Sequence, residues 1–166
     1  MSLSNASLME HQNALSGANR RDSEYGLSKM ADGLFRRSQA AGRTKRLWSL
    51  LSGRSNRLKD LNRLNAYPSR SRRGSGIRPV GIDQIVGTQG RNPDFDRDFN
   101  PLKGHLHDRW ISVARARLQG DPLPAVELIQ VGDEYYVQDG HHRISVARAL
   151  GEYSIDARVQ VWQLTG

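Results

Sequence analysis

The sequence lacks cysteine, has few aromatic side chains and contains no long apolar run. Aromatic residues make up 7% of its 166 residues, and Cys is absent. The absence of Cys excludes a disulfide framework, a thiolate metal site and thiol catalysis. No apolar run approaches the roughly 18 residues of a membrane-spanning helix, and the N-terminus lacks the apolar core of a signal peptide. We therefore expect a soluble, cytoplasmic protein without a membrane partner.

Acidic residues are scarce only in the first half of the chain. The whole sequence has 25 Lys and Arg against 17 Asp and Glu, a net charge of +8. Residues 1–77 hold 15 basic and 5 acidic side chains, whereas residues 78–166 hold 10 and 12. A domain usually takes roughly 100–200 residues. The charge break therefore predicts a basic extension over residues 1–76 and one near-neutral domain over residues 77–166.

The extension combines weak helical patterns with segments that have none. Residues 1–22 are rich in Ser, Asn and Ala, and we expect them to be disordered. Apolar residues at helical spacing predict helices over residues 24–40, 44–51 and 55–66. Residues 68–76 contain Pro, Gly, Ser and Arg alone, which predicts a basic linker.

Basic residues cluster along this extension. The clusters are Arg20 and Arg21, Arg36 and Arg37, Arg43, Lys45 and Arg46, and Arg70, Arg72 and Arg73. Such clusters neutralise phosphates without reading sequence, which makes residues 1–76 a candidate for non-specific nucleic-acid contact. The alternative is a solvated, partly helical tail that packs Leu58, Leu61 and Leu64 on the domain or on a partner.

The second half mixes strands and helices. We expect strands over residues 77–86, 125–131, 134–137 and 155–162, a helix over residues 107–119, and a short helix that begins after Asp139-Gly140 and ends at Gly151. These elements do not follow the strict strand–helix alternation of a parallel sheet. The predicted fold class is therefore α+β.

One segment carries the most chemistry. A strand ends at Asp139-Gly140, and a helix begins at once with His141, His142 and Arg143. Free backbone N–H groups and the positive end of the helix dipole bind anions at such a start, and an Arg adds a planar donor fork. A cation is disfavoured at a helix N-terminus, which suggests a negatively charged guest. The alternative is that Asp139 caps the helix and the basic side chains are merely exposed.

The sequence does not predict a metal site. His141 and His142 are adjacent, and neighbouring helical side chains diverge by about 100°, so such a pair rarely chelates one ion. Residues 94–98 imitate the start of an EF-hand loop. That loop needs Gly at its sixth position and Glu at its twelfth, where Phe99 and His105 stand instead.

Residues 137–151, with the hairpin before them, resemble the signature region of the ParB/sulfiredoxin superfamily. ParB proteins carry G-E-R-R-x-R-A at this point, sulfiredoxins carry G-C-H-R, and free-serine kinases of this fold carry motifs close to D-G-H-H-R, which here is Asp139–Arg143. The upstream order is also similar: a strand at residues 80–86, Arg91 in a loop, a helix, and Leu-Pro-x-Val at residues 123–126. The resemblance covers residues 77–162.

The resemblance implies a nucleotide site. Members of the superfamily bind the phosphates of CTP, ATP or ADP at this turn. By carry-over, the phosphate-binding residues are Gly140, His141, His142 and Arg143, with Arg91 as a further candidate, and the ligand is a nucleoside triphosphate, CTP or ATP, alone or with Mg²⁺. The catalytic Cys of sulfiredoxins aligns with His141, so that activity is excluded. Only 15 residues follow Gly151, so we expect no ParB helix-turn-helix domain.

The resulting function hypothesis is a ParB-like, nucleotide-binding module that is regulatory or DNA-associated. One alternative is an enzyme of this fold, a phosphotransferase or a nuclease, for which Asp139 is the sequence-adjacent candidate for a general base. Another alternative is a non-catalytic interaction domain in which the signature is only architectural.

Overall fold

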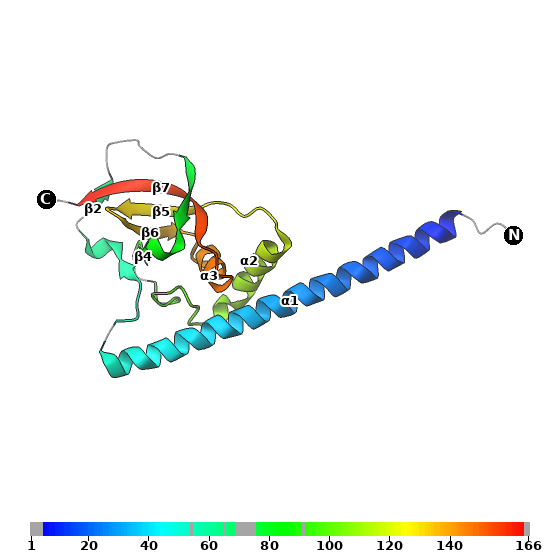
Figure 1. Ribbon diagram of the computed structural model, residues 1–166, viewed down its shortest axis with the longest axis horizontal. Helices are drawn as coiled ribbons and strands as arrows, with labels where there is room; N and C mark the ends of the chain where they lie inside the picture. Colours follow the sequence, from blue (N-terminus) through cyan, green and yellow to red (C-terminus); the bar gives the residue numbers. More distant parts are fainter. Residues whose placement is uncertain (1–4, 54, 65, 69–75, 91, 165–166) are drawn as a thin grey trace.

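The computed structural model describes residues 5–53, 55–64, 66–68, 76–90 and 92–164 (Figure 1). The helices are α1 (Asn5–Ser52), α2 (His107–Gln119) and α3 (His141–Ala149), and 3₁₀ turns cover Leu61–Arg63, Ile82–Gln84 and Gly104–Leu106. The strands are β1 (Lys59–Asp60), β2 (Ala66–Pro68), β3 (Ile77–Gly81), β4 (Ile85–Thr88), β5 (Val126–Val131), β6 (Glu134–Asp139) and β7 (Ser154–Leu164). None of the described helices combines the length and apolar character that a membrane crossing needs.

The described strands form one mixed sheet of seven. Its main path runs β1-β4-β6-β5-β7-β2, and β3 pairs with the first part of β7. The β5–β6 hairpin is antiparallel, while β4 pairs with β6, and β5 with β7, in parallel. This mixed sheet with its helices confirms the α+β fold class.

Apolar side chains cover both faces of the sheet. The larger cluster joins the sheet to α1, α2 and α3, and its fully buried members include Trp110, Val126, Leu128, Val137 and Ile144. A smaller cluster lies on the opposite face of the same central strands and is formed by Leu61, Ile129, Val131 and Tyr136. Neighbouring residues of a strand point to opposite faces, which is why Leu128 and Ile129 belong to different clusters.

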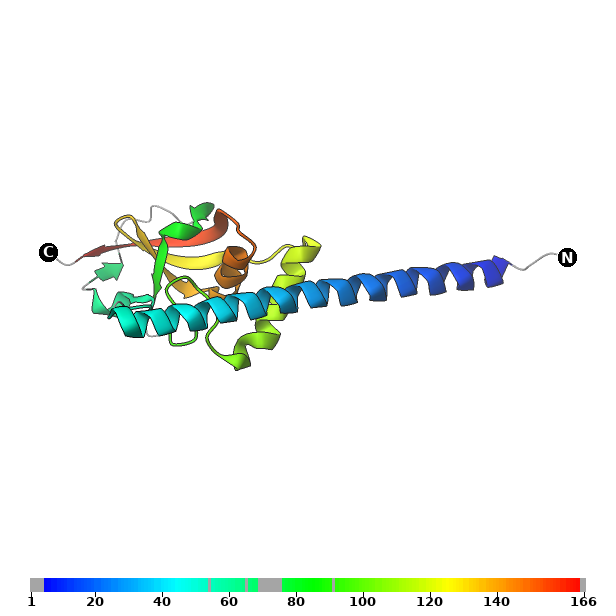
Figure 2. The ribbon, with the colours of Figure 1, turned by 60° about the horizontal axis from the view of Figure 1, so that its bottom comes forward.

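The N-terminal segment is one continuous helix. The disorder expected over residues 1–22 was wrong for residues 5–22. The break expected between the helices over residues 24–40 and 44–51 is also absent. Helix α1 runs without interruption from Asn5 to Ser52. It is held by Ala31 and Phe35, which are 0% and 4% exposed, and by Gly42, whose added Cβ would lie 3.0 Å from Cβ of Asn100. These are contacts between segments distant in the sequence, which a local pattern does not contain. Figures 1 and 2 both show the first half of α1 extending past the domain.

The helix expected over residues 55–66 is also absent. Asp60 caps a single 3₁₀ turn by accepting a hydrogen bond from the backbone N–H of Asn62 at 3.1 Å. Strand β1 before this turn pairs with β4, and β2 after it pairs with β7. Leu61 is buried, whereas Leu64 is 36% exposed, so the three-residue leucine spacing does not mark one buried face. Pairing with distant strands has overridden the local helical pattern.

The expected linker over residues 68–76 falls almost entirely on residues 69–75, which lie outside the described residues. The proposed boundary at residue 76 stays a prediction. The segments before it nevertheless contribute β1, β2 and the buried Phe35 and Leu61 to the folded body.

The elements of the second half agree better with the sequence. Helix α2 has the expected bounds and ends at Gly120, which has φ +77°. The strand expected over residues 77–86 is divided into β3 and β4 by the 3₁₀ turn Ile82–Gln84. The Arg148 side chain of α3 donates to the carbonyl oxygens of Ile82 (2.6 Å) and Ile85 (3.2 Å), and it thereby fixes this interruption.

Candidate functional site

The turn between β6 and α3 is built around Gly140. Its φ is +108°, a left-handed conformation that L side chains rarely adopt. A Cβ added at this position would lie 2.6 Å from Cγ1 of Val126 and 2.8 Å from its Cβ. Both the backbone and the space therefore call for glycine. The carbonyl oxygen of Gly140 accepts from the N–H of Ile144 at 3.0 Å, which starts α3 at once.

The turn lies at the edge where two parallel strands end. Strands β4 and β6 are parallel, and Thr88 at the end of β4 is in register with Val137 of β6. The backbone N–H of Gln89 donates to the carbonyl oxygen of Val137 at 2.8 Å. In open sheets with parallel strands, ligands bind outside such carboxyl ends. Arg91, the further phosphate-binding candidate in the loop after β4, lies outside the described residues.

Asp139 does not cap α3, so the cap that the sequence suggested for this residue was wrong. Gly140 occupies the N-cap position, and no side chain makes a capping hydrogen bond. Asp139 is one residue too early for this role, and its carboxylate instead accepts from Nη2 of Arg143 at 2.5 Å. The Asp139 side chain is 60% exposed. The first-turn N–H groups of α3 therefore stay available to water or to an anion.

Arg143 holds three chain segments together. Its Nη1 donates to the carbonyl oxygens of Pro124 (2.6 Å) and Ala125 (2.9 Å), and its Nη2 donates to Asp139. Only 15% of its side chain is exposed. The guanidinium thus ties the start of β5 and the end of β6 to α3. A phosphate at the helix start would compete with the Asp139 carboxylate for Nη2.

His141 is a neutral imidazole in an aromatic environment. Its ring stacks on Phe95 with a centroid separation of 6.0 Å and an interplanar angle of 18°. Its Nε2 lies 2.8 Å from Oγ1 of Thr88, a side chain that is 2% exposed. Burial, and secondly the neighbouring His142, lower the pKa of His141 to about 4. At pH 7 it therefore carries no charge toward an anion.

His142 also packs on Phe95, with its ring edge toward the Phe95 ring at 5.4 Å. Burial, followed by the positive charge of Arg109, lowers the pKa of His142 below its ordinary value. Its Nε2 is buried and has no hydrogen-bond partner among the described residues. A buried polar atom without a partner is costly and is often satisfied by a ligand or a water. Among the phosphate candidates in the described part of the chain, Arg143 is thus the cation.

The loop that covers both histidines is organised by Asp96, which is completely buried. The Asp96 carboxylate accepts from the backbone N–H groups of Asp98 and Asn100, both at 2.9 Å, and from the side-chain amide of Asn100. Phe95 and Phe99 are 3% and 1% exposed. Asp96, one of the acidic residues that imitate an EF-hand, therefore closes this loop into a turn. Across the described residues, no group of three or more His, Asp or Glu side chains is placed to hold a metal ion.

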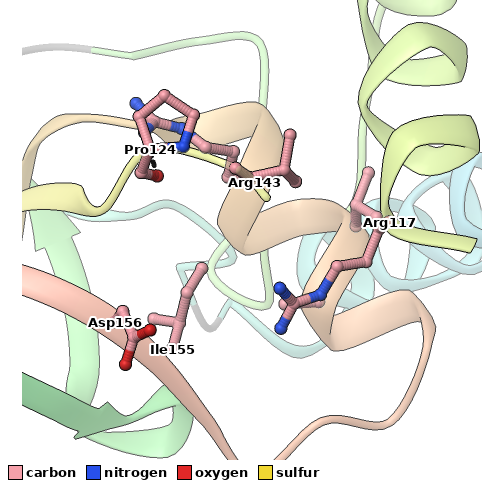
Figure 3. A pocket seen from close by; sticks show the side chains of 8 residues that line it. Arg117, Pro124, Arg143, Ile155 and Asp156 are labelled. Carbon is pink, nitrogen blue, oxygen red and sulfur yellow. Dashed lines mark hydrogen bonds between the residues drawn. The ribbon is translucent and has the colours of Figure 1, made fainter. Parts of the chain in front are cut away.

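Arg143 also lines a small pocket (Figure 3). It has about 30 Å³ of free volume and is lined by Arg117, Leu123, Pro124, Arg143, Val146, Ala147, Ile155 and Asp156. Arg117 reaches it from α2 while making a bidentate ion pair with Glu152, at 2.7 and 2.6 Å. This space suits a water-sized group rather than a nucleobase. The sequence pattern does not single out Arg117, because its partner Glu152 lies 35 positions away.

No protein-family model and no curated protein matches the chain. A solved structure to which it is similar is the sulfiredoxin from Arabidopsis thaliana, with 17% sequence identity and a TM-score of 0.40. The similarity covers 53% of this chain and 88% of the sulfiredoxin chain.

Proposed function

We propose that the chain binds the phosphate group of a nucleotide, CTP or ATP, at the start of α3. The observation that carries the proposal is the Gly140 turn, which opens an uncapped helix whose first turn contains no acidic residue. His141, His142 and Arg143 are the first three residues of that helix. The D-G-H-H-R motif at Asp139–Arg143, which resembles the phosphate-binding turn of the ParB/sulfiredoxin superfamily, supports a nucleotide over other anions.

Each group at the start of α3 would have a separate role in binding the phosphate. The backbone N–H groups at the helix start donate to the phosphate oxygens, aided by the helix dipole. Arg143 supplies the positive charge through Nη2, which leaves Asp139 for the ligand. His142 supplies a neutral ring nitrogen, Nε2, that has no partner among the described residues. Where Mg²⁺ accompanies the nucleotide, the displaced carboxylate of Asp139 is within the same turn and is of the ligand type that Mg²⁺ prefers.

The test is calorimetric titration of the purified chain with ATP, CTP, ADP and GTP, with and without Mg²⁺. Arg143→Ala should weaken binding about tenfold to a hundredfold, because a hydrogen bond to a charged group contributes about 1.5–3 kcal/mol. The matched control is Arg37→Ala, which removes the same charge from an exposed position on α1 and should leave affinity unchanged. If the wild-type chain binds none of these nucleotides, the turn is architectural and the interaction-domain alternative applies.

A further inference from the structure

The last two turns of α1 leave the body of the protein. The helix is anchored at Phe35, which is buried, and at Lys45, whose Nζ lies 2.8 Å from Oδ2 of Asp98. Beyond this ion pair the large apolar side chains are in water: Leu47, Trp48, Leu50 and Leu51 are 64%, 67%, 75% and 81% exposed. Gly53, with φ +67°, then turns the chain away. Exposed apolar residues are ordinary one by one, but a contiguous group of this kind marks an interaction site.

These four residues, here named the apolar tip, share one side of the helix. At 100° per residue they fall within an arc of about 160°. The arc is centred opposite the side that carries Ala31, Phe35 and Gly42, which face the domain. The tip therefore points outward and is accessible to a large flat partner.

The charge around the apolar tip is positive. Residues 26–52 contain six basic side chains, Lys29, Arg36, Arg37, Arg43, Lys45 and Arg46, and one acidic side chain, Asp32. Asp32 is bound by His107 and Arg36, at 2.7 and 3.1 Å, so its charge is already matched. A partner for this end of α1 must therefore be anionic. Two copies of the same helix end would bring like charges together.

We propose that the apolar tip lies in the surface of an anionic lipid bilayer. Leu47, Trp48 and Leu51 would enter the boundary between headgroups and acyl chains, and Arg43 and Arg46 would stay among the acidic headgroups. A helix with Trp and Leu on one side and basic residues beside them is typical of such interfacial binding. A nucleic-acid backbone matches the charge but gives three leucines nothing to bury against. The proposal revises the expectation of no membrane partner, which concerned spanning segments.

The first experiment is sedimentation of the full chain with vesicles. Vesicles of equal parts phosphatidylserine and phosphatidylcholine should carry the protein down, and vesicles of phosphatidylcholine alone should not. Binding should weaken as salt rises, because exposed charges are screened over about 10 Å at 0.1 M salt. The emission of Trp48 should shift to shorter wavelength on binding, because its indole is 67% exposed in the free protein.

Three variants decide between the possible partners. Leu47→Gln with Leu51→Gln should lower vesicle binding about tenfold or more. Arg43→Gln with Arg46→Gln should lower it about thirtyfold, from the attraction of about 1 kcal/mol per basic residue. The matched control is Leu164→Gln, an apolar side chain that is 58% exposed on β7 and should have no effect. All replaced side chains are exposed, so the melting temperature should not change.

Three outcomes would overturn the proposal. One is the absence of binding to the acidic vesicles. Another is vesicle binding that the leucine variant retains in full. The third is a result that assigns the surface to a different partner. A leucine-dependent dimer in gel filtration would do so, and so would a preference for duplex DNA over vesicles that the leucine variant retains.

Discussion

Nε2 of His107 lies 2.7 Å from Oδ1 of Asp32, and this contact joins the start of α2 to α1. Nδ1 of the same ring lies 3.0 Å from Oδ1 of Asp108, so both ring nitrogens face carboxylates. These two hydrogen bonds, the one to Asp108 first, raise the pKa of His107 above its ordinary value, and the one to Asp32 lowers the pKa of Asp32. Arg36 also forms an ion pair with Asp32, and its positive charge opposes protonation of His107. The docking of α1 is thus linked to a proton.

The sign of that linkage gives the first prediction. Because the folded-state pKa of His107 is raised, its contribution is fully present below the unfolded imidazole value of about 6.5, and it is lost as pH rises through the raised pKa. The melting temperature of the wild type should therefore fall above pH 6.5, and that of His107→Gln should fall less. His105→Gln, whose imidazole pairs with Asp94, is the control. Parallel pH profiles of wild type and His107→Gln would contradict the linkage.

Gly140 gives a prediction about folding. Gly140→Ala should destabilise the protein by about 2–4 kcal/mol, since it combines a left-handed residue with a Cβ inside the contact distance of Val126. Gly132→Ala isolates the backbone part, because Gly132 has φ +60° and an added Cβ would meet nothing within 4 Å. That control should cost only about 1–2 kcal/mol. Urea denaturation measures the free energy of unfolding of both variants. Equal losses would mean that Val126 shifts to accommodate the added Cβ at little cost.

Asp139 gives a prediction that separates competition from catalysis. If the Asp139 carboxylate occupies Arg143 in place of a phosphate, Asp139→Asn should tighten the binding of the Mg²⁺-free nucleotide, because it removes both the competing acceptor charge and its repulsion of the ligand. Glu127→Gln, a neutralised carboxylate on the adjacent strand β5, is the control. Calorimetry is the measurement. An unchanged affinity in Asp139→Asn, together with loss of any phosphate transfer, would assign Asp139 the role of a base instead.

Arg143 should matter for stability as well as for binding. Its side chain is largely buried and donates to two carbonyl oxygens and a carboxylate. Arg143→Ala leaves those acceptors unpaired, and we expect a loss of about 1–3 kcal/mol in the free energy of unfolding. Chemical denaturation of Arg143→Ala and of the exposed Arg37→Ala tests this. A variant as stable as the wild type would show that water replaces the guanidinium at little cost.

Proteolysis tests the boundary at residue 76. We expect cleavage within residues 68–76 and a folded fragment over residues 77–166. Because β1 pairs with β4 and β2 pairs with β7, the nicked halves should elute together in gel filtration. The isolated fragment would lose Phe35, whose ring centroid lies 5.5 Å from that of Trp110, and should melt at a lower temperature. A fragment that fails to fold would place the N-terminal segments in the domain core.

The sequence correctly predicted those features that depend on residues close together in the chain. The Gly120 stop of α2, the β5–β6 hairpin at Gly132 and the sharp turn at Gly140 all depend on a glycine with positive φ, and the sequence shows each of them directly. The strand and helix bounds of the second half follow from apolar spacing between those turns. The fold class followed because these elements lie next to one another along the chain.

Contacts between distant segments account for what the sequence did not predict. Residues 55–66 have helical spacing but pair as strands with β4 and β7, more than twenty positions away. His141 and His142 read as basic residues, yet both rings pack against Phe95 from a distant loop, and burial lowers the pKa of each. Arg143 reads as a free donor, yet Pro124 and Ala125 occupy Nη1.

The closed turn around Asp96 has two neighbours. On one side, Asp98 and Asn100 contact Lys45 and Gly42 of α1. On the other side, Phe95 lies against the rings of His141 and His142. Any binding event that moves α1 away from this turn therefore also disturbs Phe95, which covers the start of α3. Thermodynamic reciprocity then requires that whatever α1 binds and whatever α3 binds influence each other's affinity by the same factor.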